Sequence, residues 1–597
     1  MPKKLLMGNE AIALGAMRAG VRVVTGYPGT PSTEVLETVA RHNDGSVYVE
    51  WSVNEKSALE VAAGASFAGA RAMVTMKQVG LNVACDPLIN LNYIGVQGGM
   101  VIVVADDPGP ISSQNEQDTR HFSKFARLAL FDPSTPEEAY AMIADAFACS
   151  EKYGRPVLFR PTTRVCHSCA SVETLEHLPK SEPAGFAKDS KWVIFPRLAY
   201  ANKFKIEENL KAMREEFAGY EKNILAGSGR KGIAAGGVSY AYVREALENT
   251  ELKNTECKLL KISTLPFPEK LALDFLDGLD EALVIEELDP VIENELVLLC
   301  GLRHLNVKIL GKRSGHVQSA GEQTADSAAK AASAFLGVAL PQAADKTLPP
   351  LPARPPVLCA GCPHRASFFA VKEAAKGKRA VFSGDIGCYT LGNAQPLDMV
   401  DTCLCMGAGI TIAQGLQRVE PNTAHFAFIG DSTFFHTGIP GIANAVYNQT
   451  DIIVVALDNS TTAMTGNQPH PGTGLTMMGG KTGKISIEKI VAALNVSAVV
   501  RVNPFDQKAA KDAVASLMAQ KGVRVLLFEA PCIAVSKSAA KAAVDGSVCT
   551  GCEICLKKIG CPAISMEYGK ACVSAALCAG CGLCASVCKT GAINMRE

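Results

Sequence analysis

The cysteines of the C-terminal segment constrain the fold of this chain more than any other feature. Nine of the 21 cysteines lie between residues 549 and 588, in two similarly spaced runs. The first run, Cys-x2-Cys-x2-Cys-x5-Cys, begins at Cys549, and the second, Cys-x2-Cys-x2-Cys-x3-Cys, begins at Cys578. In a chain with no sign of secretion, cysteines clustered in this way indicate metal binding or redox chemistry rather than disulfides.

The spacing of both runs matches the two-cluster bacterial ferredoxin pattern, in which the fourth cysteine of each run binds the cluster of the other run. The alternative is a pair of zinc ribbons, which also use Cys-x2-Cys pairs. There are two departures: a longer loop precedes Cys561, and Lys589 follows Cys588 where proline is usual. We expect two 4Fe–4S clusters, one held by Cys549, Cys552, Cys555 and Cys588 and the other by Cys578, Cys581, Cys584 and Cys561.

The length and charge of the chain exclude several classes of protein. A length of 597 residues predicts roughly four domains of about 150 residues each. Lys plus Arg and Asp plus Glu both total 59, which argues against nucleic-acid binding because that function usually needs a basic surplus. No apolar run approaches the roughly 18 residues of a membrane span, and the N-terminus does not read as a secretory signal. We therefore expect a cytoplasmic protein with no nucleic-acid or membrane partner.

Short apolar strands alternate with helices over most of the chain. Strands over Val21–Thr25 and Val47–Trp51 enclose a helix over Glu34–Arg41, and Glu55–Ala70 reads as a closely packed helix. Fully apolar strands such as Met100–Ala105 are typical of buried parallel sheets, so the fold class is α/β. We expect α/β domains at 1–165, 223–345 and 357–540, a connector at 166–222, a Pro-rich linker at 346–356 and the cysteine-rich domain at 541–597.

Two strands of the third domain end in residues that suit a magnesium diphosphate. The strand Phe426–Ile429 runs into Gly430-Asp431-Ser432, and the strand Asp451–Leu457 ends before Asn459. This spacing resembles the thiamine diphosphate signature. Mg²⁺ prefers oxygen ligands and takes few of them from protein, so Asp431, Asn459 and the carbonyl of Thr461 are the expected ligands. Gly430 and the helix start at Ser432 would admit the phosphates. The alternative is that these are ordinary turn residues.

Thiamine enzymes also need a carboxylic acid that faces the pyrimidine ring and exchanges a proton with it. Glu55 begins a small, apolar helix directly after a strand, in the first domain. We expect it to be this acid. Glu50 and Glu60 are its rivals, and each fits better as a solvated or paired acid.

Three motifs together resemble the 2-oxoacid:ferredoxin oxidoreductases, and most closely the large (alpha) subunit of the indolepyruvate enzymes. Tyr27–Thr33, YPGTPST, is similar to that superfamily's YPxTPS turn, whose threonine contacts substrate or cofactor and maps to Thr30. Asn54-Glu55 before an Ala- and Gly-rich helix matches the family's cofactor-activating glutamate. Cys359–Arg365, CAGCPHR, is close to the indolepyruvate subunit's CPGCPHR.

This resemblance implies the identities of the domains. It implies a pyrimidine-binding thiamine diphosphate domain at 1–165, a transketolase C-terminal-like domain at 223–345, a diphosphate-binding domain at 357–540 and a two-cluster ferredoxin-like α+β domain at 541–597. It also implies a reaction in which an arylpyruvate such as indolepyruvate reacts with coenzyme A, giving arylacetyl-CoA, CO₂ and electrons for external ferredoxin. Its cofactors are thiamine diphosphate, Mg²⁺ and 4Fe–4S clusters.

The same resemblance implies a partner. A small (beta) subunit of the same enzyme would complete the pocket, in an assembly of two large and two small subunits. Branched-chain, phenylglyoxylate and pyruvate substrates stay open within the superfamily. A non-redox thiamine decarboxylase is the rival reaction, but it does not account for the cysteine runs. A pure electron-transfer protein leaves Glu55, Asp431 and Asn459 unexplained.

The resemblance to the pyruvate enzymes of this superfamily also implies a third 4Fe–4S cluster beside the thiamine. Its ligands map to Cys359, Cys362, Cys388 and Cys532. The alternative is four buried thiols, and the continuation Pro363-His364 departs from the pyruvate enzymes. The residues that could line the substrate pocket are Gln114, Asp118, Arg120, His436 and His470, and the sequence does not rank them.

Overall fold

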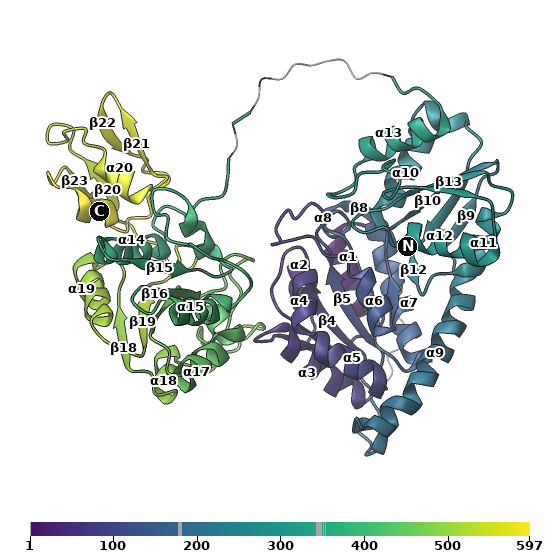
Figure 1. The fold of residues 1–597 in the computed structure, drawn as a ribbon, viewed down its shortest axis with the longest axis horizontal. Helices are drawn as coiled ribbons and strands as arrows, with labels where there is room; N and C mark the ends of the chain where they lie inside the picture. The colour runs from purple at the N-terminus through teal and green to yellow at the C-terminus, as the bar shows by residue number, and fades with distance from the viewer. Residues whose placement is uncertain (1, 177–181, 342–348, 350, 353, 597) are drawn as a thin grey trace. The chain divides into compact units, whose positions relative to one another are not determined.

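The computed structural model describes residues 2–176, 182–341, 349, 351–352 and 354–596. The chain divides into two compact units, residues 1–347 and 348–597, and Figure 1 shows the elements of each. The predicted linker at 346–356 falls partly outside the described residues. Within the described ranges, no helix combines the length and the apolar character that crossing a membrane requires.

A seven-stranded sheet forms the centre of the first unit, in the order β12-β6-β7-β5-β4-β2-β3. All its neighbours run parallel except the edge strand β12. Every residue of β5 is buried, as expected for a parallel strand covered on both faces. Its strands are β2 (Val23–Gly26), β3 (Tyr48–Trp51), β4 (Ala72–Lys77), β5 (Met100–Ala105), β6 (Ala129–Phe131), β7 (Val157–Phe159) and β12 (Thr264–Leu265).

Helices cover this sheet and position the residues at its carboxyl edge. The α3 helix packs on β2 and β4 through small side chains, so its first residue, Glu55, is held next to the strand ends. Ser32 is the N-cap residue of α2, but its hydroxyl donates to the carbonyl of Gly29 at 2.9 Å instead of capping the helix. The helices are α1 (Gly8–Arg18), α2 (Thr33–His42), α3 (Glu55–Phe67), α4 (Gln78–Val83), α5 (Cys85–Ile94), α6 (Arg120–Ala126), α7 (Pro136–Tyr153) and α8 (Thr163–His167).

The segment expected as a connector, 166–222, contributes regular structure to the first unit. Strand β8 (Cys169–Glu173) pairs antiparallel with β1 (Lys3–Met7), and the long helix α9 (Pro196–Ala218) packs on α5 and α11. The strand β12, which lies within the predicted second domain, joins the first sheet through β6. The first two predicted domains therefore share structural elements.

A second sheet, in the order β14-β13-β10-β11-β9, completes the first unit. Its neighbours are parallel except for the edge strand β9. The strands are β9 (Ile224–Ala226), β10 (Lys231–Gly236), β11 (Lys258–Ile262), β13 (Glu281–Ile285) and β14 (Lys308–Leu310). The helices are α10 (Gly237–Asn249), α11 (Glu269–Leu276), α12 (Val291–Arg303) and α13 (Ala325–Leu336), with short 3₁₀ turns at Ser190–Trp192 and Glu251–Asn254.

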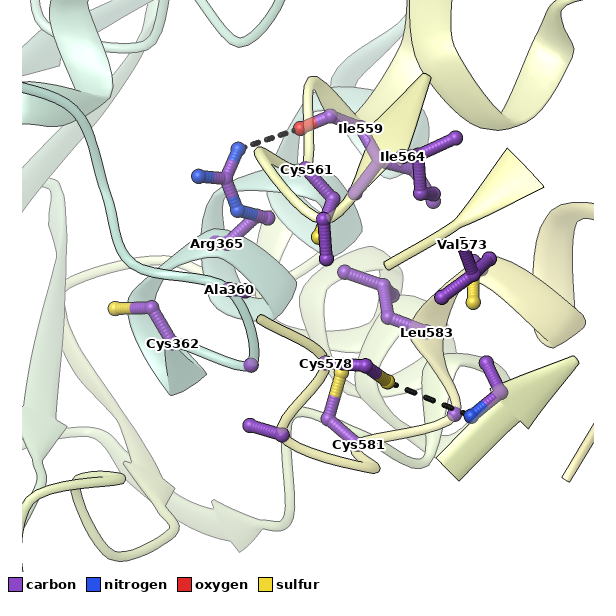
Figure 2. A pocket seen from close by; sticks show the side chains of 16 residues that line it. Ala360, Cys362, Arg365, Ile559, Cys561, Ile564, Val573, Cys578, Cys581 and Leu583 are labelled. Atoms are coloured by element: carbon purple, nitrogen blue, oxygen red, sulfur yellow. Dashed lines mark hydrogen bonds between the residues drawn. The ribbon is translucent and has the colours of Figure 1, made fainter. Parts of the chain in front are cut away.

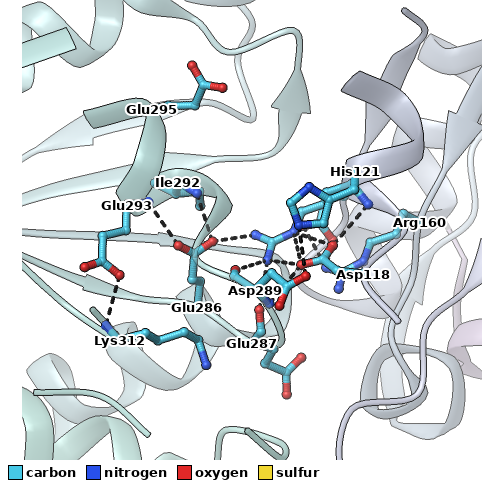
Figure 3. A network of polar contacts seen from close by, with 12 residues as sticks. Asp118, His121, Arg160, Glu286, Glu287, Asp289, Ile292, Glu293, Glu295 and Lys312 are labelled. Atoms are coloured by element: carbon cyan, nitrogen blue, oxygen red, sulfur yellow. Dashed lines mark hydrogen bonds and ion pairs between the residues drawn. The ribbon is translucent and has the colours of Figure 1, made fainter. Parts of the chain in front are cut away.

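A buried ion network ties the segment after β5 to the second sheet (Figure 3). Arg120 pairs with Asp118 at 2.6 Å and with Glu286 at 2.7 Å, and it also donates to the carbonyl of Glu287 at 2.8 Å. The sequence offers Asp118 and Arg120 as candidates for the substrate pocket. Both are buried and fully engaged in this contact between the two halves of the unit.

The second unit is built on a five-stranded parallel sheet in the order β15-β16-β17-β19-β18. Its strands are β15 (Ala380–Ser383), β16 (Ala424–Gly430), β17 (Ile452–Asp458), β18 (Ala498–Val502) and β19 (Val523–Glu529). The helices are α14 (Pro363–Ala375), α15 (Ala408–Val419), α16 (Asp431–Thr433), α17 (Ile439–Tyr447), α18 (Ile487–Ala493) and α19 (Gln507–Met518), with a 3₁₀ helix at Cys388–Asn393 and a short π-helix at Phe434–Gly438.

The cysteine-rich tail is a small α+β body with two similar halves. The strand β20 (Lys541–Val544) pairs with β23 (Ile593–Arg596), and β21 (Ile564–Glu567) pairs with β22 (Lys570–Val573), both antiparallel. The helices α20 (Ile554–Ile559) and α21 (Leu583–Val587) pack on each other, and α20 also contacts α14. The tail therefore shares a core with the domain that precedes it.

Candidate active site and metal centres

The strand ends predicted to hold a magnesium diphosphate lie side by side. β16 and β17 are adjacent parallel strands, so Asp431 and Asn459 emerge at the same carboxyl edge. Asp431 Oδ2 accepts the backbone N–H groups of Asn459 at 3.1 Å and Ser460 at 2.8 Å. Asn459 Oδ1 accepts the N–H of Thr461 at 3.2 Å. Both side chains are buried.

Two buried histidines adjoin this pair. Nε2 of His470 lies 3.1 Å from Asp431 Oδ2, and Nε2 of His364 lies 3.1 Å from Asn459 Nδ2. Burial opposes ionisation of Asp431, but His470 and nearby N–H groups outweigh it and hold the pKa of this carboxyl below its usual range. Burial lowers the pKa of His364 to about 4, so its ring is neutral near pH 7. The sequence offers His470 as a candidate for the substrate pocket. His364 stands out in the sequence only as part of the CPHR motif.

The glycine before Asp431 makes room for an aromatic ring. A Cβ at Gly430 would lie 2.4 Å from Cε1 of Tyr389, whose hydroxyl donates to Thr433 Oγ1 at 3.1 Å. The hydroxyl of Thr462 donates to Ser432 Oγ at 3.0 Å. The expected contact of Gly430 with the phosphates stays a prediction.

A second acid lies in the same region. Asp385 is fully buried, and its Oδ1 accepts the N–H groups of Ile386 at 2.7 Å and Gly407 at 2.8 Å. Burial raises the pKa of Asp385 to about 7, while a nearby His436, another predicted pocket residue, opposes that rise. A hydrogen bond with the side chain of Tyr389 also opposes the rise in the pKa of Asp385.

These residues suit the group that the sequence predicts. A buried, ionised carboxylate beside an amide and a backbone carbonyl is the hard-oxygen set that Mg²⁺ prefers when phosphates supply its other ligands. Among the residues present, Asp431, Asn459 and the carbonyl of Thr461 would hold the metal. The open sheet edge beyond them is where ligands bind in such folds.

In the first unit, Glu55 is the first residue of α3, and its side chain is buried. The N-cap Asn54 accepts the N–H of Ser57 at 2.8 Å, which fixes the start of the helix. Gly80 in α4 packs directly against the Glu55 carboxylate. Its rivals are engaged elsewhere: Glu50 accepts the hydroxyls of Tyr48 and Ser52, each at 2.6 Å, and the exposed Glu60 pairs with Lys56.

The structure adds a cation that the sequence did not single out. Lys77 ends β4, and its side chain lies against Gly29, next to the Thr30 turn. Nζ of Lys77 donates to the carbonyl of Ser112 at 3.0 Å, and the Ser112 hydroxyl donates to the carbonyl of Thr30 at 3.3 Å. Burial lowers the pKa of Lys77, and the carboxylates of Asp107 and Glu55 oppose that change. Lys77, Thr30 and Glu55 therefore gather at one edge, whereas Gln114 is exposed.

The tail brings its cysteines together in the predicted crosswise sets. Backbone N–H groups of Ala571 and Gly551 lower the pKa of Cys549, and the neighbouring Cys588 opposes them. Burial raises the pKa of Cys555, and Cys552 and Cys588 add to that rise. Residues from the two ends of the tail thus form one group: Cys549, Cys552, Cys555 and Cys588.

The other set lines a pocket (Figure 2). Burial raises the pKa of Cys584 to about 12, and the nearby thiols of Cys581, Cys561 and Cys578 contribute. The N–H groups of Ala542 and Gly580 each lie 3.4 Å from the Cys578 sulfur. N–H groups directed at sulfur and an apolar wall are the surroundings that iron–sulfur clusters use.

The four cysteines of the predicted third cluster also converge. Burial raises the pKa of Cys388 to about 11, with Cys532 and Cys359 contributing, and Cys362 adjoins Cys359. The N–H of Cys532 donates to the carbonyl of Asn459 at 2.9 Å. The cysteine group therefore directly contacts the residue expected to bind Mg²⁺.

Comparisons with known proteins agree with this geometry. Residues 14–212 match the family described as pyruvate flavodoxin/ferredoxin oxidoreductase, thiamine diphosphate-binding, and residues 385–528 match the thiamine pyrophosphate enzyme, C-terminal TPP binding domain. The second match contains Asp431 and Asn459. Both thiamine-binding domains are thus present in an α/β fold.

Curated relatives match nearly the whole chain. Indolepyruvate oxidoreductase subunit IorA of Pyrococcus horikoshii is 42% identical over 592 residues, which cover 92% of this chain and 90% of the relative. The subunit of the same name from Methanothermobacter thermautotrophicus is 41% identical, with the same coverage. Ketoisovalerate oxidoreductase subunit VorB from that organism is 24% identical over 53% of this chain and 95% of its own length.

Proposed function

Because this chain belongs to the family of indolepyruvate oxidoreductase subunits IorA, we propose that it oxidatively decarboxylates arylpyruvates, with indolepyruvate as the preferred substrate. In this reaction coenzyme A takes the acyl group, and the cysteine sets would hold 4Fe–4S clusters, which would supply electron transfer to ferredoxin. Thiamine diphosphate, when bound, supplies the carbanion chemistry. The protein binds and orients the reactants, excludes water and moves protons. The expected location is the cytoplasm, where coenzyme A and ferredoxin are available.

One observation carries the redox part of the proposal. Cys532, an expected ligand of the third cluster, donates its N–H to Asn459, an expected ligand of Mg²⁺, at 2.9 Å. An electron acceptor held by this cysteine group would lie directly beside the diphosphate site. A non-redox decarboxylase has no use for that arrangement or for the eight cysteines of the tail.

Residues of both units divide the remaining tasks. Glu55 would hold the proton that is exchanged with the ring of a bound cofactor, which is a role that a buried acid at a helix start can perform. Lys77 and Thr30 bind the substrate: the Lys77 ammonium is a partly buried cation, which suits the carboxylate of a 2-oxoacid. Asp431, Asn459 and Thr461 hold the metal, with Gly430 and Ser432 at the phosphate end.

The partner proposal follows from the name of the relatives, which designates a subunit. We expect a small subunit to complete the enzyme in an assembly of two large and two small chains. External ferredoxin and coenzyme A are its other partners.

The test is acyl-CoA formation from a panel of 2-oxoacids by this chain, with and without its small subunit. Indolepyruvate, phenylpyruvate, phenylglyoxylate, 2-ketoisovalerate and pyruvate form the panel, and the mass in solution is measured in parallel. The proposal predicts CoA-dependent ferredoxin reduction that is fastest with indolepyruvate and requires the small subunit. Preference for 2-ketoisovalerate would overturn the substrate, and aldehyde release without ferredoxin reduction would overturn the reaction class.

A further inference from the structure

We infer that Arg365 sets the reduction potential of the cluster held by Cys561, Cys578, Cys581 and Cys584. Its guanidinium is the buried counter-charge of that cluster at the junction with the third cysteine group. This inference rests on the proposed clusters. It concerns a residue to which neither the sequence motifs nor the comparisons give a role.

The position of Arg365 joins two parts of the second unit. It lies in the first turn of α14, three residues after Cys362, and is only 4% exposed. One guanidinium nitrogen donates to the carbonyls of Ile559 at 2.7 Å and Gly560 at 2.8 Å, immediately before Cys561 (Figure 2). The other donates to the carbonyl of Leu358, next to Cys359. Arg365 therefore binds the backbone beside both cysteine groups.

The charge of Arg365 has no carboxylate partner. An arginine stays protonated in proteins, and a buried charge normally needs a counter-charge. Among the described residues, no Asp or Glu oxygen lies within 4.0 Å of its guanidinium, and its Nε is buried without a hydrogen-bond partner. Burial lowers the pKa of Arg365, and the groups that oppose this are four cysteines: Cys561, Cys362, Cys581 and Cys359.

The two cysteine motifs around Arg365 are in direct contact. Gly361, between Cys359 and Cys362, has a φ of +79°, and a Cβ there would lie 2.5 Å from the Cβ of Ala579. Ala579 follows Cys578 in the tail. A Cβ on Gly560 would similarly collide with Pro396 at 2.3 Å. The two segments are therefore closely packed at Gly361 and Gly560, and the buried charge of Arg365 acts in a setting of low dielectric constant.

The Cys549 set and the Cys578 set of the tail have similar surroundings, so a difference between their reduction potentials can be attributed to Arg365. The ammonium of Lys541 donates to the carbonyl of Cys578, and that of Lys570 donates to the carbonyl of Cys549. The sulfurs of Cys578 and Cys549 accept the N–H groups of Ala542 and Ala571 at 3.4 and 3.5 Å. The two sites thus have matching lysines and N–H donors, and Arg365 lines the pocket of the Cys578 set.

The sign of the effect follows from charge. A cluster bound by four thiolates gains a negative charge on reduction, and net charge is one of the factors that set its potential. A buried cation stabilises the reduced form. Arg365 therefore raises the potential of the cluster bound by the Cys578 set above that of the Cys549 set. The cluster nearer to the third cysteine group is then the better electron acceptor of the pair.

The test is an EPR-monitored redox titration of the full chain with its clusters in place, under anaerobic conditions. Arg365→Gln removes the charge and keeps a donor, whereas Arg365→Lys keeps the charge. For Arg365→Gln we expect the reduction potential of this cluster to fall by at least about 59 mV, which is a tenfold shift of a one-electron equilibrium toward the oxidised cluster. Arg365→Lys should shift less, and Arg379→Gln, on the exposed surface of the same unit, should not shift.

Measuring the iron content shows whether a negative result concerns the role of Arg365 or the proposed function. Full iron content with an unchanged potential in Arg365→Gln overturns the role of Arg365 and leaves the proposed function intact. Absence of the clusters from the unaltered protein overturns the proposed function. If Arg365→Gln does not fold, the order of reduction in the unaltered chain decides. Cys552→Ser perturbs only the cluster of the Cys549 set, so it shows which EPR signal belongs to which cluster. A lower reduction potential for the Cys578 set than for the Cys549 set contradicts the inference.

Discussion

The carboxylate of Glu55 fills the space that a side chain at position 80 would need, because a Cβ on Gly80 would lie 2.5 Å from Glu55 Oε1. Gly80→Ala should therefore displace the carboxylate while leaving its chemistry unchanged. A displacement of about 1 Å at a reacting group can lower the rate by about 10²-fold, so we expect a loss of roughly 10- to 10²-fold in kcat. Gly64→Ala is the matched control, because nothing lies within 4 Å of a Cβ there. Equal activities of the two variants would show that the position of Glu55 is unimportant.

Removing the acid itself should have a larger effect. Glu55→Gln keeps the shape of the side chain but cannot exchange the proton, so turnover should fall by about 10²- to 10⁴-fold. Thiamine diphosphate should still bind, as measured by isothermal titration. Glu60→Gln, at an exposed residue of the same helix, should retain activity. Near-normal turnover in Glu55→Gln would transfer the role to another acid.

Lys77 should contribute to substrate binding rather than to cofactor binding. Hydrogen bonds to charged groups contribute about 1.5–3 kcal/mol, so Lys77→Met should raise the KM for the 2-oxoacid by about 10- to 10²-fold. The affinity for thiamine diphosphate should not change. The control is Lys56→Met, on the exposed side of α3. An unchanged KM together with a weaker cofactor affinity would contradict this assignment.

The pH dependence of stability should report on Glu287. Burial raises the pKa of Glu287 from 4.5 to about 7. The folded state then holds the proton more tightly than the unfolded state, so this stabilisation is complete below about pH 4.5 and is lost as the pH rises through 7. At 1.36 kcal/mol per unit, the change is about 3 kcal/mol.

Thermal unfolding of the full chain at pH 5 and pH 8 measures this effect. Glu287→Gln should reduce the drop in melting temperature between the two pH values, and Glu256→Gln, at an exposed position, should leave it unchanged. Identical pH dependence in Glu287→Gln and the unaltered protein would exclude Glu287 as the titrating group.

Local patterns in the sequence were sufficient to predict the strand ends and the cysteine sets. Asp431 and Asn459 each follow a continuous apolar strand, and parallel strands place such ends at one edge. The crosswise pairing of Cys561 with the Cys578 run is implied by the resemblance to the two-cluster ferredoxin pattern, and in the structure these cysteines line one pocket.

Residues whose environment depends on distant segments were not predictable in this way. Lys77 reads as the polar end of a strand, and only the fold places it beside Thr30. Arg365 and Ile559 are 194 residues apart in the sequence, so nothing local reveals their contact. Asp118 and Arg120 are candidates for the substrate pocket in the sequence, whereas their partners in the segment after β13 are 166 or more residues away.

The central claim is that the thiamine site and the iron–sulfur clusters form one electron path. The most direct measurement is the bleaching of the visible iron–sulfur absorbance after anaerobic addition of indolepyruvate and coenzyme A to the assembled enzyme. We predict bleaching in the unaltered enzyme and in the control Asp512→Ala, an exposed acid of α19. Asp431→Ala and Asn459→Ala would each remove an expected oxygen ligand of Mg²⁺, so their clusters should stay oxidised until dithionite is added. Substrate-driven bleaching of equal extent in Asp431→Ala, or none in the unaltered enzyme supplied with thiamine diphosphate and Mg²⁺, would contradict the claim.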